Sequence, residues 1–98
     1  MKTIRFFFDW GTNQCLWDNA GLINLNHLGI SQSLYNMLTN MGEEIQTALN
    51  WDDPKAPSPW SLEHRADFVR RAKSAYQQLC QELSDRYEIL YDFSWFEQ

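Results

Sequence analysis

Few side chains in this sequence have the types and spacing that chemistry at a site requires. Asp52 and Asp53 are adjacent carboxylates, whereas acid–base catalysis needs two carboxyl groups whose pKa values are driven apart by burial. Because both lie in a polar, proline-rich stretch, we predict that they steer a ligand or sit at a helix end. His64 and Asp67 are three residues apart on a predicted helix, but a zinc site needs three or four converging ligands. We therefore predict no metal site.

The spacings of common catalytic motifs are also missing from the sequence. The four glycines are too widely spaced for a phosphate-binding loop, and no nucleophile motif surrounds the serines or Cys80. We predict that the protein is not an enzyme and has no cofactor. Cys15 and Cys80 lack a CxxC spacing, so two inert thiols in a reducing compartment are favoured over a disulfide.

Composition and charge limit the classes of partner. The 98 residues predict one domain, 1–98, which is large enough for a core without cross-links. Thirteen acidic and eight basic residues give a net charge of −5, which disfavours nonspecific nucleic-acid binding and suits basic partners. The N-terminal residues do not predict a signal peptide, and no apolar run approaches the roughly 20 residues that span a bilayer. We expect a cytoplasmic protein that binds neither nucleic acid nor a membrane.

Alternating apolar residues predict a strand over 3–8 and a closing strand over 87–93. Residues 17–21 contain the Asp, Asn and Gly of a turn, and 22–25 are predicted as a short strand. Both terminal strands are apolar enough to be buried, so we expect them to pair, in a direction that the sequence leaves open. The side chains expected to face the core from the first strand are Ile4, Phe6 and Phe8.

Apolar residues at three- and four-residue spacing predict two helices, over 31–50 and 61–86. Gly42 weakens the first by about 1 kcal/mol relative to alanine, which close packing against a neighbour or a slight bend would explain. Two antiparallel helices on a small sheet form a two-layer α+β domain. The candidate N-caps, whose hydroxyl accepts an amide hydrogen bond, are Ser31 or Ser33 and Ser58 or Ser61.

The second predicted helix carries a run of basic residues. We interpret this run as a solvated helix face with ion pairs four residues apart, each worth a few tenths of a kcal/mol. Contact with an anion or a partner is the alternative. The basic residues are Arg65, Arg70, Arg71 and Lys73, interrupted by Asp67.

Residues 51–60 are the stretch best suited to recognition. They hold all three prolines, which fix φ and remove backbone donors, so this connector between the helices is expected to be stiff. Tryptophan buries a large area at little entropic cost, although tryptophans in loops also plug the edges of small cores. The side chains predicted to bind a partner are Trp17, Asp18, Trp51, Asp52, Asp53 and Trp60.

Four fragments of the sequence resemble small bacterial immunity proteins, which neutralise toxins of contact-dependent growth inhibition and related polymorphic toxin systems. The resemblance implies a stoichiometric inhibitor that binds the C-terminal domain of a cognate toxin, often a nuclease, and occludes its active site or substrate path. It carries over no individual binding residue. The fragments are residues 7–11 (FFDWG), 16–18 (LWD), 49–54 (LNWDDP) and 57–61 (PSPWS).

Two other functions stay open. One is a structural or regulatory module that forms a homodimer through exposed aromatic residues of the C-terminal tail, Trp95 and Phe96. The other is a small-molecule binder with an aromatic-lined pocket between the turn at Trp17 and the 51–60 loop.

Overall fold

The two terminal strands, Lys2–Phe6 and Tyr87–Tyr91, pair at one side of a four-stranded sheet, and the second of them is an edge strand. The computed structural model describes residues 2–97, with the side chains of Trp95 and Glu97 outside that description. The strands follow the order β3-β2-β1-β4, in which β1 pairs with β4 in parallel and the other neighbours are antiparallel. The predicted pairing of the terminal strands is confirmed. The strands are β1 (Lys2–Phe6), β2 (Leu16–Asp18), β3 (Gly21–Leu22) and β4 (Tyr87–Tyr91).

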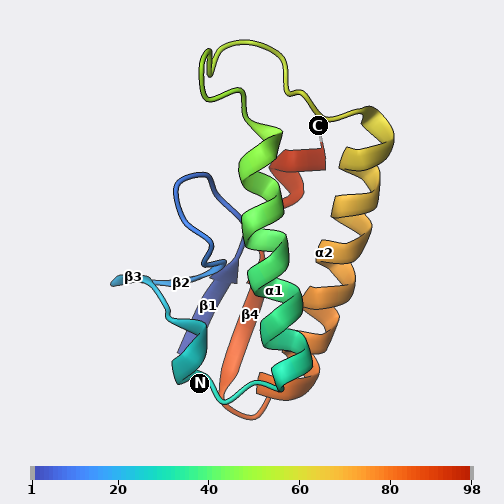
Figure 1. The fold of residues 1–98 in the computed structure, drawn as a ribbon. Coiled ribbons are helices and arrows are strands. Elements are labelled where there is room, and N and C mark those ends of the chain that lie inside the picture. Colours follow the sequence, from blue (N-terminus) through green and yellow to red (C-terminus); the bar gives the residue numbers. More distant parts are fainter. Residues whose placement is uncertain (1, 98) are drawn as a thin grey trace.

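Two helices cover one face of this sheet. Figure 1 shows α1 (Gln32–Glu44) and α2 (Leu62–Leu83) side by side and antiparallel, with the sheet behind them. The predicted α+β class and two-layer arrangement are confirmed. Short 3₁₀ turns complete the chain: η1 (Leu25–His27), η2 (Ile45–Ala48) and η3 (Ser94–Glu97).

Serine side chains begin both helices. Ser31 Oγ accepts a hydrogen bond from the Leu34 amide at 3.2 Å, and Ser61 Oγ accepts one from the His64 amide at 3.0 Å. These bonds satisfy amides that have no partner within the helix. Ser31 and Ser61 are therefore the caps among the predicted candidates.

Five predicted elements extended too far. The strands predicted over 3–8 and 87–93 end at Phe6 and Tyr91. The first helix leaves α geometry at Glu44 and tightens into η2, and the second ends at Leu83. The strand predicted over 22–25 was wrong beyond Leu22, because the Asn24 side chain accepts the Asn26 amide and starts η1. The hydrogen bond from the Asn26 amide to the Asn24 side chain thus favours a turn over the strand that the apolar pattern predicted.

The core lies between the sheet and the helices. Ile4, Phe6 and Phe8 are fully buried, as predicted. Phe8 meets Phe68 of α2 edge-to-face, with ring centroids 5.3 Å apart. Phe96 is 1% exposed and stacks on Phe93, so its predicted exposure was wrong. The reason is that η3 folds back onto α2, where Phe96 gains burial that an extended tail would forgo.

Gly42 marks a close approach between α1 and the segment after β1. A Cβ at this position would lie 2.4 Å from the carbonyl oxygen of Asn13. The predicted close packing is confirmed, and it explains a glycine inside a helix.

Candidate interaction surfaces

The six side chains predicted to bind a partner occupy two separate parts of the molecule. Trp17 and Asp18 belong to β2, on the strand side of the fold. The other four belong to the 51–60 loop, which arches beyond the end of the helix pair (Figure 1). The fold therefore does not bring the two groups together into one site, and none of the hollows described among residues 2–97 is lined by residues of both groups.

Trp17 lies on the face of the sheet that the helices leave open. Its ring stacks on Phe7 with centroids 4.6 Å apart and planes 3° apart, and its Nε1 donates to the Phe7 carbonyl at 3.2 Å. The cross-strand register aligns Trp17 with Arg5 and Leu22, and Arg5 with Leu90. These four residues form one row across all four strands, in which Leu22 and Leu90 are 47% and 45% exposed.

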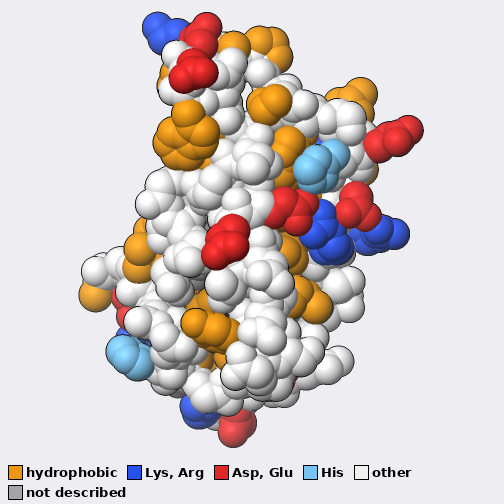
Figure 2. Space-filling model, in the orientation of Figure 1, with side chains coloured by type: hydrophobic (Ala, Val, Ile, Leu, Met, Phe, Trp, Pro, Cys, Tyr) orange, Lys and Arg blue, Asp and Glu red, His pale blue; other side chains and the backbone are white. Residues whose placement is uncertain are grey.

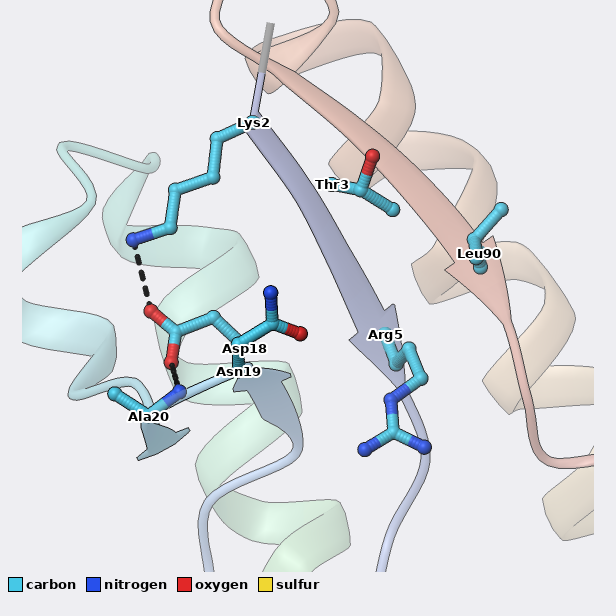
Figure 3. Close-up of a pocket in the computed structure, with 7 residues that line it drawn as sticks. All are labelled: Lys2, Thr3, Arg5, Asp18, Asn19, Ala20 and Leu90. Carbon is cyan, nitrogen blue, oxygen red and sulfur yellow. Dashed lines mark hydrogen bonds and ion pairs between the residues drawn. The ribbon is translucent and has the colours of Figure 1, made fainter.

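A hollow of about 510 Å³ adjoins this row (Figure 3). Asp18 faces it but is engaged within the fold, because its carboxylate lies 2.8 Å from Lys2 Nζ and accepts the Ala20 amide. The hydrogen bond from Lys2 is the main cause that lowers the pKa of Asp18. Asp18 thus ties the β2–β3 turn to β1. The residues lining the hollow are Lys2, Thr3, Arg5, Asp18, Asn19, Ala20 and Leu90.

Hydrogen bonds with side chains hold the first residues of the 51–60 loop, whose own side chains are exposed. The Asn50 side chain accepts the amides of Asp52 and Asp53, both at 3.1 Å. Trp51 donates its Nε1 to the Gln46 carbonyl at 2.7 Å, while its side chain remains 56% exposed. Both carboxylates are exposed, which suits steering of a charged partner and not an acid–base pair. Figure 2 shows acidic, basic and hydrophobic side chains gathered at this end of the molecule.

Trp60 has different surroundings from Trp51. Its indole stacks on the His64 ring with centroids 3.8 Å apart and packs against Phe68 at 5.2 Å. Its Nε1 donates to Thr47 Oγ1 at 2.8 Å. Trp60 therefore connects η2 with α2 and anchors the end of the loop to the core.

An ionic cluster between the helices was missed from the sequence. Arg71 of α2 donates to both carboxylate oxygens of Glu44 of α1, at 2.7 and 2.6 Å, and to Asp67 at 2.8 Å. His64 Nε2 lies 2.8 Å from the same Glu44 carboxylate. Hydrogen bonds from Arg71 are the main cause that lowers the pKa of Glu44 to about 2. Ion pairs four residues apart were predicted on this helix face, and Asp67 with Arg71 forms one. No local pattern in the sequence indicates that Arg71 also bridges the helices.

The described residues contain few features of other site types. Among their side chains, no group of three or more His, Cys, Asp or Glu could hold a metal ion. Cys15 and Cys80 are both free thiols, and burial raises the pKa of Cys15. No described helix is both long and apolar enough to cross a membrane.

The described residues form a small α+β domain with an exposed acidic loop, in a chain of net charge −5. The chain is a member of the Serratia CdiI immunity protein-like family, whose model matches residues 2–94. No curated protein matches the chain. The predicted resemblance to immunity proteins of contact-dependent growth inhibition is confirmed, and membership supports toxin neutralisation through a protein–protein interaction.

Proposed function

We propose that this protein neutralises the C-terminal domain of its cognate toxin, a nuclease, by stoichiometric binding that occludes the active site or substrate path. It does so in the cytoplasm and without catalysis. The observation that carries the proposal is the 51–60 loop, where Trp51, Asp52 and Asp53 are exposed on a backbone that side chains already fix.

Charge favours a nuclease as the target. A nuclease contacts a polyanion, so the path of its substrate is basic. The chain has a net charge of −5, and its exposed acidic loop is able to pair with such a surface. Electrostatic steering raises association rates toward ~10⁸ M⁻¹s⁻¹ at low salt, which suits an inhibitor that must act before its target does damage.

Rigidity favours the loop over the other predicted contacts. A loop that is ordered before binding loses little conformational entropy when the complex forms. Trp60 holds this loop to the core, and Asp18 is engaged with Lys2. We therefore assign the contact to Trp51, Asp52 and Asp53, with Trp60 as their support.

Calorimetric titration tests the proposal. The titrant is the C-terminal domain encoded by the adjacent upstream reading frame, made catalytically inactive. We expect one-to-one binding with nanomolar Kd that weakens as salt increases. Absence of heat and of a complex, with both proteins folded, would overturn the proposal.

A competition experiment tests the occlusion mechanism separately. A fluorescent, non-cleavable oligonucleotide is bound to the inactive toxin domain, and the immunity protein is added. We expect the oligonucleotide to be released in proportion to the protein added. A stable ternary complex would contradict occlusion while leaving neutralisation in place.

A further inference from the structure

The first half of α2 carries an apolar stripe that is only partly buried in the core. Leu62, Ala66 and Val69 are spaced four and three residues apart, so they lie on one face of the helix. Leu62 is 84% exposed, more than Trp51, Leu22 or Leu90. Ala66 is exposed, and Val69 is half-buried where the stripe meets the core. These three residues are called the α2 stripe below.

The fold does not require leucine at position 62. Ser61 supplies the N-cap of α2 through its bond to the His64 amide. Trp60 supplies the apolar contact that secures the helix start, by packing on Phe68. An isolated exposed leucine needs no explanation, but one that begins a stripe beside an acidic loop points to a covered surface.

Ala66 lies between two shallow hollows. One, of about 290 Å³, is lined by Leu62, Arg65, Ala66 and Val69. The other, of about 390 Å³, is lined by Glu63, Ala66, Asp67 and Arg70. The small side chain of Ala66 leaves room on both sides for side chains of a partner.

The walls of both hollows are held in place by the fold. Arg65 Nε donates to the Phe96 carbonyl at 2.7 Å, and its guanidinium lies 4.1 Å from the Phe96 ring centroid. On the other side, Asp67 pairs with Arg70 and with Arg71. A surface with fixed walls loses little entropy when a partner covers it.

From these contacts we infer that the α2 stripe is the apolar anchor of the toxin contact, an inference that rests on the proposed function. The exposed 51–60 loop ends one residue before α2, and Glu63 lines one of the two hollows beside Ala66. The occupant that fits is a toxin surface with apolar side chains opposite the stripe and basic residues opposite Glu63 and the exposed carboxylates of the loop. Interfaces concentrate binding energy in such a centre, and a charged rim sets the association rate.

Paired variants of exposed residues test this inference by titration with the inactive toxin domain. Leu62→Ala removes the end of the stripe, and Ala66→Tyr places a bulky ring at the position that the two hollows share. Their controls are Leu90→Ala and Ala20→Tyr, which make the same changes at exposed positions beside the hollow on the sheet face. Circular dichroism and urea unfolding establish that all four variants fold.

We expect both stripe variants to raise Kd at least tenfold, while the two controls change it less than about twofold. Leu62→Ala should leave the salt dependence of Kd unchanged, because the side chain is uncharged. Wild-type binding together with unchanged Kd in both stripe variants would overturn this inference and leave the proposed function standing. Absence of wild-type binding would overturn both.

Sedimentation velocity of the free protein tests the competing occupant, a second copy of this chain. We expect a monomer at all concentrations. A dimer that Leu62→Ala dissociates and Leu90→Ala does not would assign the stripe to self-association and overturn the inference.

Discussion

Glu44 of α1 and Arg71 of α2 form a bidentate ion pair, with two hydrogen bonds of 2.7 and 2.6 Å. The pair joins the two helices across the groove that faces away from the sheet, and Met37 and Met41 line the same groove. Because the Glu44 side chain is only 27% exposed, solvent screens the pair less than it screens a surface ion pair. The cluster also includes His64, on which Trp60 stacks, and so connects the helix pair to the base of the 51–60 loop.

Removing the Glu44 charge should destabilise the helix pair. We expect Glu44→Gln to lower the free energy of unfolding by about 1–3 kcal/mol, because Arg71 loses the charged carboxylate of Glu44 in a partly buried place and keeps only its bond to Asp67. Urea unfolding measures the difference. Glu43→Gln, an exposed neighbour on the same helix, should change stability by less than about 0.5 kcal/mol. Equal effects of the two variants would show that the ion pair contributes nothing specific.

Acid should weaken the same pair in a defined pH range. The pKa of Glu44 is lowered from 4.5 to about 2 in the folded state, chiefly by hydrogen bonds from Arg71. Between these values the unfolded chain binds more protons at this group than the folded chain does. Its stabilising contribution is therefore complete above pH 4.5 and is lost as the pH falls toward 2.

Urea unfolding of the wild type and Glu44→Gln between pH 7 and pH 2 measures this dependence. We expect the gap in stability between the two proteins to be constant at neutral pH and to close at the acid end. A gap that stays the same throughout would contradict the lowered pKa.

Gly42→Ala should destabilise the protein although alanine is the better helix former. Helix propensity alone favours alanine by about 1 kcal/mol. The new Cβ would lie 2.4 Å from the Asn13 carbonyl oxygen, so the backbone must shift, and overpacking of this kind typically costs about 1–3 kcal/mol. Asn40→Ala, at an exposed position of α1, should instead stabilise by a few tenths of a kcal/mol. If thermal unfolding shows that Gly42→Ala also stabilises, the contact is looser than described.

The two tryptophans of the loop should respond oppositely to truncation. Trp51→Ala should leave stability nearly unchanged and weaken toxin binding by about 2 kcal/mol, because the exposed ring is assigned to the partner. Trp60→Ala should lower stability by about 2–3 kcal/mol, because its ring packs on His64 and Phe68. Urea unfolding and titration on both variants separate the roles. Strong destabilisation by Trp51→Ala would make that ring structural.

Charge reversal in the loop should weaken binding and its salt dependence together. We expect Asp52→Lys with Asp53→Lys to raise Kd at least tenfold at low salt, since like charges then face each other. The matched control is Asp85→Lys with Glu88→Lys, which makes the same change in net charge at exposed positions outside the loop. Titration at several salt concentrations measures both effects. If the two double variants weaken binding equally, the net charge of the protein accounts for the effect and the loop is not the contact.

Local patterns in the sequence were enough to predict much of the fold. The alternation of Ile4, Phe6 and Phe8 predicted a strand with these side chains facing the core, and the serines before 32 and 62 predicted helix starts, because both signals depend on neighbours in the chain. The glycine at 42 predicted a close contact for a steric reason. The aromatic and acidic residues at 51–53 predicted an exposed recognition loop, and its exposure is confirmed.

Contacts between segments far apart in the chain could not be predicted from the sequence. The pairing of Glu44 with Arg71 spans 27 residues, and the burial of Phe96 depends on Phe68 of α2 and on Phe93, which follows β4. The fold also decided which side chains share a surface: it separated Trp17 from the 51–60 loop and left Leu62 exposed at the start of α2. The sequence by itself determined the elements, the charge and the family, because these follow from residue types and short spacings. Only the tertiary structure decided which side chains are free to meet a partner, because exposure depends on what the rest of the chain packs against each one.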